Sequence, residues 1–387
     1  QVADELRNDI NKRQINWDAL YQTNYAANDI VRNVNGITGN DVAGLRSKYI
    51  LEDRIINTTK YNFNSTLNTS VSENVTFTAG VTYQSQKNHY YKEIVDLLGG
   101  EFYVDVNQFG ERDFPTNFGA GQNDLNNPNR LVGVGDKHGY NYDLNIKRGS
   151  VWLQGVFKFP KFDVVVSTEH SYTSFFRFGN VKSGLFANNS YGKSTTYNFY
   201  NSGIKAGVTY KIDGRNYIFA NGSYGSRAPF FENAFIAPRT RDFVQDNLKS
   251  EEILSTEVGY AMNAPKLKLR LNGYFTQFKN GLNVLTFYND EYRNFVNYAI
   301  SNIGKVHMGI EFGAEAKVYK GLSITAAAAI GQYTYNTRQS ATVTADNSAA
   351  ELDKDVTVYS KDFYVPTAQQ AYTIGFDYRS PQFWFLN

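Results

Sequence analysis

Two kinds of connection alternate along this chain, and this alternation constrains the fold more than any other feature. Very short turns join neighbouring stretches in pairs, as at Ser72-Glu73-Asn74, Asp213-Gly214 and Lys320-Gly321. Between the pairs lie long segments, at roughly residues 93–138, 179–195, 227–249, 281–301 and 338–366. Asp-Gly and proline-containing turns are typical of β-hairpins. Short turns at one end and long loops at the other favour a transmembrane barrel over a soluble sandwich, which has no reason to keep its long loops together.

The paired stretches alternate between apolar and polar residues with a period of two. Between residues 306 and 318 the even positions are apolar, and the odd positions carry His307, Glu311, Glu315 and Lys317 among glycines. Successive side chains of a strand point to opposite faces, so this pattern predicts strands with one apolar face. We expect the even positions to face lipid and the odd ones to face the lumen.

The pattern predicts about twelve antiparallel strands in an all-β transmembrane barrel. They cover residues 47–70, 75–92, 139–158, 163–178, 196–211, 215–226, 250–263, 267–280, 302–318, 322–337, 367–379 and a strand begun at Phe383. That last strand stops at Asn387, short of the about 9 to 11 residues that cross a hydrocarbon layer. An open strand edge in lipid leaves backbone groups unsatisfied. We therefore expect the sequence to be incomplete at its C-terminus, and at its N-terminus too.

Residues 1–46 differ from the rest of the chain. Leu6 and Ile10 lie four apart among charged residues, which gives a weak helical period over the first 23 residues. We interpret residues 1–46 as an extracellular loop segment that is partly helical, and residues 47–387 as a partial transmembrane barrel with long extracellular loops. A solvated polar lead-in explains the first residues equally well.

Composition narrows the class of protein further. Tyrosine and phenylalanine supply 29 and 28 positions, and mean hydropathy is −0.46. Outer-membrane barrels combine aromatic girdles with a polar lumen. No apolar run approaches the roughly 18 residues of a membrane-spanning helix. A net charge of +2 gives no concentrated basic character for nucleic acid. The absence of cysteine argues only against a small disulfide scaffold.

Three segments resemble the barrel of TonB-dependent outer-membrane receptors. Residues 223–235, with Arg227-Ala228-Pro229 at their centre, are similar to the family's FRAP segment. Residues 248–260 look like its L-x-P-E…E-x-G-Y strand, with Ser250 where proline is usual. Residues 302–311 resemble its N-x-G-x…G-(V/I)-E strand. The asparagine-rich loop at 122–130 also looks like receptors of the Bacteroidetes type. Arg227 is expected to brace the base of its loop through Glu232 or Glu251.

The resemblance implies a 22-stranded barrel of the Gram-negative outer membrane, occluded by an N-terminal plug that this sequence does not include, with further strands after Asn387. It implies TonB-dependent active import of a scarce nutrient, such as a siderophore, cofactor, glycan or peptide. The implied partners are outer-membrane lipid, an extracellular small ligand and the TonB-ExbB-ExbD energising complex, which acts through the N-terminal region. A surface lipoprotein is a further partner that the resemblance leaves open.

No residue pattern indicates catalysis. The four histidines, His89, His138, His170 and His307, lack metal-ligand spacing. Neither a Gly-x-Ser-x-Gly elbow nor an Asp-x-Asp-x-Asp-Gly calcium pattern is present. We therefore expect no enzyme activity, no cofactor, no metal site and no nucleic-acid partner.

Two neighbouring loops carry residue types that grip ligands, since aromatic and arginine side chains are favoured at binding sites. The candidate ligand-binding residues are Phe230, Phe231, Arg239, Arg241, Phe287, Tyr288, Tyr292 and Arg293. The alternative for each is a packing role within an aromatic rim. Two other readings of the whole chain remain open at this stage. One is a complete twelve-stranded pore or barrel enzyme, and the other is a secreted adhesin-like β protein.

Overall fold

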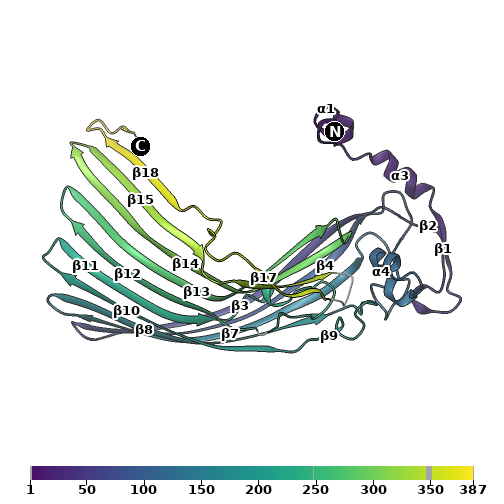
Figure 1. The fold of residues 1–387 in the computed structure, drawn as a ribbon, viewed down its shortest axis with the longest axis horizontal. Coiled ribbons are helices and arrows are strands. Elements are labelled where there is room, and N and C mark those ends of the chain that lie inside the picture. The colour runs from purple at the N-terminus through teal and green to yellow at the C-terminus, as the bar shows by residue number, and fades with distance from the viewer. Residues whose placement is uncertain (1, 247, 346–350, 387) are drawn as a thin grey trace.

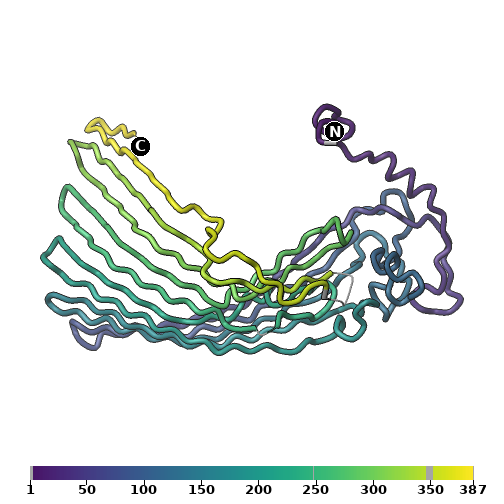
Figure 2. The backbone as a smooth tube through the Cα atoms, in the orientation of Figure 1, coloured from purple at the N-terminus to yellow at the C-terminus, as the bar shows by residue number. Residues whose placement is uncertain are grey.

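A single curved antiparallel sheet forms most of the molecule (Figures 1 and 2). The computed structural model describes residues 2–246, 248–345 and 351–386. The main path of the sheet runs through β3 (Leu51–Ser72), β4 (Val75–Asp96), β7 (Lys137–Lys158), β8 (Phe162–Gly179), β10 (Tyr197–Lys211), β11 (Asn216–Arg227), β12 (Glu251–Asn263), β13 (Leu267–Asn289), β14 (Asn294–Tyr319), β15 (Leu322–Tyr335), β18 (Gln370–Arg379) and β19 (Phe385–Leu386). Each strand pairs with its neighbours in this order, so the predicted twelve-strand meander is confirmed.

The sheet is open, with β3 at one edge and β19 at the other. The tight turns between strands gather at one end of the curved sheet, and the long segments gather at the opposite end (Figure 1). The predicted segregation of short and long connections is therefore confirmed.

The two faces of the sheet differ as the period of two predicts. Met308, Ile310 and Phe312 share one face of β14 and are 42%, 58% and 37% exposed. On the other face Glu311 accepts a hydrogen bond from Asn272, and charged partners line neighbouring strands. Over β13 and β14 the side chains thus sort into an apolar face and a polar face.

The prediction of a long loop at residues 281–301 was wrong. There β13 and β14 continue as a paired hairpin from Val284↔Ala299 to Asn289↔Asn294. The pairing shifts register around Gly281, where Asn280 and Asn302 have φ angles of +59° and +56°. Asparagine tolerates this left-handed conformation, so the bulge changes the twist of the ladder without ending it.

The other long segments also hold local structure. Residues 338–366 contain β16 (Gln339–Ala345), which pairs with β14, and β17 (Glu351–Val358), which pairs with β16. Residues 346–350 lie outside the described residues. Residues 93–138 contain the end of β4, β5 (Tyr103–Val104), α4 (Gln108–Asp113), η2 (Phe118–Gly121) and β6 (Leu131–Val132). The segment after β8 contributes β9 (Gly192–Lys193). These segments were predicted as loops and are instead partly ordered by backbone pairing.

The N-terminal segment is helical at its start. It contains α1 (Val2–Asn8), α2 (Ile10–Arg13), α3 (Trp17–Tyr25), β1 (Asn28–Val31), η1 (Val34–Gly36) and β2 (Val42–Leu45). The fully buried Asn24 fastens α3 to the sheet. Its Nδ2 donates to the carbonyl oxygens of Tyr49 at 2.8 Å and Leu97 at 2.9 Å. The segment thus lies at the end that carries the long connections (Figure 1).

Candidate ligand-binding site

Residues 228–246, 248 and 249, which follow β11, fold onto the inner face of the sheet and are called the folded-in segment below. The segment contains the short helix α5 (Phe231–Ala234) and then Phe235, which is 1% exposed. Phe235 packs edge-on against the rings of Phe175 and Tyr197, with centroids 6.2 and 6.1 Å away. The core cluster around it also includes Leu144. Because this contact excludes water from apolar side chains, it stabilises the position of the segment on the inner face of the sheet.

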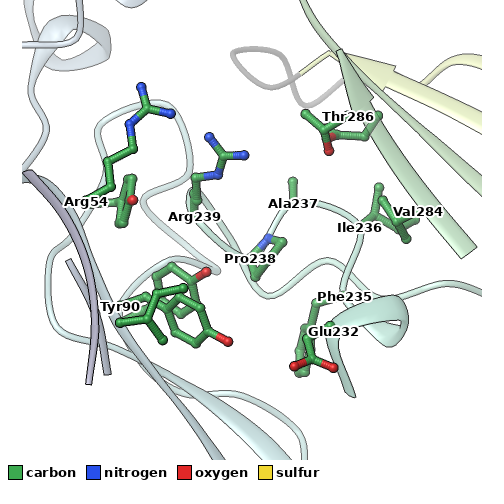
Figure 3. Close-up of a pocket in the computed structure, with 14 residues that line it drawn as sticks. Arg54, Tyr90, Glu232, Phe235, Ile236, Ala237, Pro238, Arg239, Val284 and Thr286 are labelled. Carbon is green, nitrogen blue, oxygen red and sulfur yellow. The ribbon is translucent and has the colours of Figure 1, made fainter. Parts of the chain in front are cut away.

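A cavity of about 360 Å³ lies between this segment, the inner face of the sheet and the β13–β14 hairpin (Figure 3). The two sides bring together residues far apart in the sequence. The lining residues are Arg54, Ile56, Tyr90, Tyr140, Tyr142, Glu232, Phe235, Ile236, Ala237, Pro238, Arg239, Val284, Thr286 and Asn297. The mixture of tyrosine, arginine and aliphatic side chains is typical of a small-molecule site.

Two arginines from opposite parts of the chain lie on the same side of this cavity (Figure 3). Arg54 is on β3, where its Nε donates to Glu52 at 3.2 Å, and its side chain is 62% exposed. Arg239 is on the folded-in segment and is exposed. Within the described part of the chain, Arg239 makes no ion pair or side-chain hydrogen bond. Its guanidinium therefore keeps all its donors available to a ligand.

Tyrosines from adjacent strands form one wall of the cavity. The rings of Tyr90 on β4 and Tyr142 on β7 stack at 4.9 Å with an interplanar angle of 3°. Tyr140 packs against Tyr142 at 6.0 Å. Such a wall offers flat apolar faces with hydroxyl groups at the ring edges.

A second cavity, of about 500 Å³, adjoins the first and shares Arg54, Tyr140 and Arg239 with it. Its titratable lining residues include Lys48, Glu52, Lys92, His138 and Arg177. Lys92 Nζ lies 2.9 Å from Glu52 Oε2, so Glu52 is shared between Lys92 and Arg54. Because they share Arg54, Tyr140 and Arg239, the two cavities form one recess with a mixed polar and apolar lining.

Glu232 is the acidic residue nearest the cavity's lower edge in Figure 3. Burial raises the pKa of the Glu232 carboxyl above its usual range. A hydrogen bond from the backbone opposes that shift only in part. Glu232 therefore gains a proton at a higher pH than a solvated carboxyl does.

The structure separates the candidate residues of the first loop. Arg239 lines both cavities. Arg241 is 3% exposed and lies over the rings of Phe186 and Phe243 at 4.2 and 5.2 Å. Phe231 packs against the core cluster. Phe230 is 56% exposed, with the Arg227 guanidinium 4.9 Å from its ring centre.

The candidates of the second loop lie at the tip of the β13–β14 hairpin. Phe287, Tyr288, Tyr292 and Arg293 are its predicted ligand contacts, and none of the four lines the described cavities. Tyr288 packs edge-on against Phe295, which does line the larger cavity. The backbone oxygen of Arg293 accepts a hydrogen bond from Arg112 at 3.3 Å, which links the tip to α4.

Sequence reasoning missed Arg54 and the tyrosine wall. Arg54, Tyr90 and Tyr140 occupy inward positions of predicted strands, where the alternation by itself predicts only a polar lumen lining. The sequence does contain a signal for them, because charged and aromatic residues occupy inward positions near the ends of the predicted strands 47–70 and 75–92.

Arg227 braces the base of the segment, as predicted. Its Nε donates to Glu251 Oε2 at 2.5 Å, across the pair Arg227↔Glu251 of β11 and β12. No contact joins it to Glu232 among the described residues.

The part of the chain that the structure describes contains no group of three or more histidine or acidic side chains arranged to hold a metal ion. Nor does it contain a helix of the length and apolarity needed to cross a membrane.

A family comparison decides what kind of barrel this is. The model of the TonB dependent receptor-like β-barrel family matches residues 3–386. The chain belongs to this family. It is therefore part of a β-barrel of the Gram-negative outer membrane, in a family of TonB-dependent receptors.

Solved structures share the fold of this TonB-dependent receptor barrel at low sequence identity. The copper transporter OprC has a TM-score of 0.53 at 11% identity, over 74% of this chain and 41% of its own. The ferric yersiniabactin receptor FyuA of Yersinia pestis has a TM-score of 0.52 at 9% identity, over 87% and 42%. The ferric citrate transporter FecA, unliganded, has a TM-score of 0.51 at 11% identity, over 88% and 42%. The chain thus spans about two-fifths of these proteins' length, and no curated protein matches its sequence.

Proposed function

We propose that this receptor barrel imports a scarce solute across the outer membrane, and that the energy comes from the TonB-ExbB-ExbD complex. Family membership supports outer-membrane uptake, and the similar structures carry names of metal and siderophore transporters. The observation that carries the proposal is the recess on the inner face, where the folded-in segment and the β13–β14 hairpin enclose a cavity.

The recess is suited to capture because its walls are built from separate elements. Arg54 comes from β3, Arg239 from the folded-in segment and Thr286 from the hairpin. A ligand held between them contacts both the rigid sheet and the connections above it. Because the ligand contacts these connections, its binding favours some of their positions over others. A transport cycle requires the connections to move.

The test compares solute uptake in three strains of the source bacterium: wild type, a strain without the receptor gene, and a strain without the energising TonB protein. Cells take up solutes from a complex medium, and mass spectrometry identifies those whose cellular accumulation needs the receptor. We expect accumulation of the same solute to be lost in both deletion strains.

A passive pore gives a different result. If accumulation of that solute needs the receptor but persists without the TonB protein, the barrel is a pore and active import is wrong. A matched control is a solute small enough to enter through general porins, whose accumulation is expected to stay equal in all three strains.

A further inference from the structure

We propose that the recess binds an anionic ligand with at least two carboxylate or phosphate groups, one of which is held by Arg54 and another by Arg239. This inference rests on the proposed import function, because it names the class of solute that the same cavity takes.

Positive charge is concentrated in the recess. Five basic side chains line its two cavities, against two carboxylates. The basic residues are Lys48, Arg54, Lys92, Arg177 and Arg239, and the acidic ones are Glu52 and Glu232. The whole chain has a net charge of only +2, so the imbalance is a local property of this surface. A concave surface of one sign raises the local concentration of ligands of the opposite sign.

The charges that face the shared part of the recess are only partly neutralised. Glu52 is engaged by Lys92 at 2.9 Å and by one nitrogen of Arg54 at 3.2 Å. That contact uses Arg54 Nε and leaves the terminal nitrogens of its guanidinium unpaired among the described residues. Arg239 has no such partner there at all. Two guanidinium groups that border the same space are suited to carboxylate or phosphate, which they bind through paired hydrogen bonds.

The backbone that carries Arg239 is held by a buried cation. Arg177 on β8 is 2% exposed, and its Nε donates to the carbonyl oxygen of Pro238 at 2.7 Å. Its Nη1 donates to the carbonyl oxygen of Ser190 at 2.8 Å. Arg177 therefore ties the backbone immediately before Arg239 to two other parts of the fold. Because this backbone is already ordered, only the side chain of Arg239 loses freedom when a ligand binds.

The remaining walls suit the carbon framework of such a ligand. The stacked rings of Tyr90 and Tyr142 give a flat face beside the arginines, and Val284 of the hairpin closes the opposite side. Tyrosine hydroxyls add hydrogen-bond donors at the rim. The adjoining volumes of about 360 and 500 Å³ accommodate a small organic acid or a larger conjugate that spans both.

The test uses the full-length receptor, purified in detergent, with two anionic probes and one neutral probe. Tricarballylate supplies carboxylates, pyrophosphate supplies phosphates, and maltotriose is the uncharged comparison. Binding is measured by isothermal titration calorimetry for wild type, R54Q and R239Q. The matched control is R148Q, because Arg148 also faces the inner side, is half-exposed and pairs with Glu169 at 3.5 Å, yet lies outside both cavities.

We expect at least one anionic probe to bind wild type and R148Q equally, and to bind R54Q and R239Q about tenfold more weakly, since each change removes a charged hydrogen-bonding partner. Whichever anion binds more tightly identifies the carboxylate or phosphate class. A second measurement uses only the wild-type protein, which is modified by phenylglyoxal with and without the probe. The bound probe should protect Arg239 from this modification. Equal anion binding by all four proteins, no anion binding by wild type, or preference for maltotriose overturns the proposal.

The proposed function and this inference can fail separately. If energised uptake of a solute is demonstrated and proceeds at the wild-type rate in R54Q and R239Q, import stands and the anion site is wrong. If the arginines govern probe binding but uptake does not need the TonB protein, the anion site stands and active import is wrong.

Discussion

Replacement of Phe235 by alanine should release the folded-in segment from the inner face of the sheet. Phe235 is 1% exposed and packs against Phe175 and Tyr197. Removal of a buried phenylalanine side chain costs about 3–5 kcal/mol. Each 1.4 kcal/mol is a factor of ten, so the docked state should lose a factor of roughly a hundred to several thousand relative to the released state.

Hydrogen exchange measured by mass spectrometry reports this opening directly. Peptides within 231–246 contain the amide of Asp242, which donates to the carbonyl oxygen of Asn189 outside the segment at 2.8 Å and is therefore protected only while the segment is docked. Its exchange should accelerate by about the same factor in F235A, whereas exchange in β12 should not change.

Phe230 provides the matched control, because it precedes the same helix but is 56% exposed. F230A should leave exchange within 231–246 close to wild type. If F235A leaves this exchange unchanged, or if F230A accelerates it equally, the segment is not held by the Phe235 contact and the reasoning is refuted.

Three further predictions concern the loop base, the acidic edge of the cavity and a close backbone contact. R227A should lower the free energy of unfolding by only about 0.2–1 kcal/mol in urea titration, because the Arg227 side chain is 48% exposed; a loss above about 3 kcal/mol would contradict this. Glu232 has a raised pKa and opposes an anion only when ionised, so binding of a disulfonate, which stays ionised, should strengthen as pH falls through that pKa. E232Q should remove this component of the pH profile, and an unaltered profile would refute the assignment. G179A should destabilise the barrel by about 1–3 kcal/mol because a Cβ there overlaps the Ser190 carbonyl oxygen, whereas G149A, where a Cβ makes only an ordinary contact with the Thr82 carbonyl oxygen at 4.0 Å, should not; equal unfolding midpoints would contradict this.

The sequence predicted the strands well because their pattern is local. Alternation at 306–318 reflects two faces with different surroundings, and this needs no knowledge of distant residues. The hairpin at 281–301 escaped prediction because its ladder passes through left-handed Asn280 and Asn302, which resemble turn residues in the sequence. The part of this hairpin that extends beyond the lipid-facing apolar residues also has no lipid on one side, so its apolar and polar residues need not alternate.

The candidate site was predictable only in part, for a related reason. Arg239 was identified from residue type within its own loop. Arg54 lies 185 positions earlier, and only the pairing of the sheet and the position of the folded-in segment bring the two to one cavity. Arg241, similar in sequence context, is instead buried between Phe186 and Phe243. Such differences arise from packing between distant segments, which no local pattern records.

A crystal structure of the full-length receptor with an iodinated dicarboxylate, 5-amino-2,4,6-triiodoisophthalate, tests the central claim most directly. Anomalous scattering from iodine locates the probe without ambiguity. We predict iodine peaks beside the Tyr90 and Tyr142 rings, with the two carboxylates within hydrogen-bond distance of Arg54 and Arg239. Iodine peaks only at other surfaces, with this recess empty in crystals soaked at saturating probe, would contradict the claim.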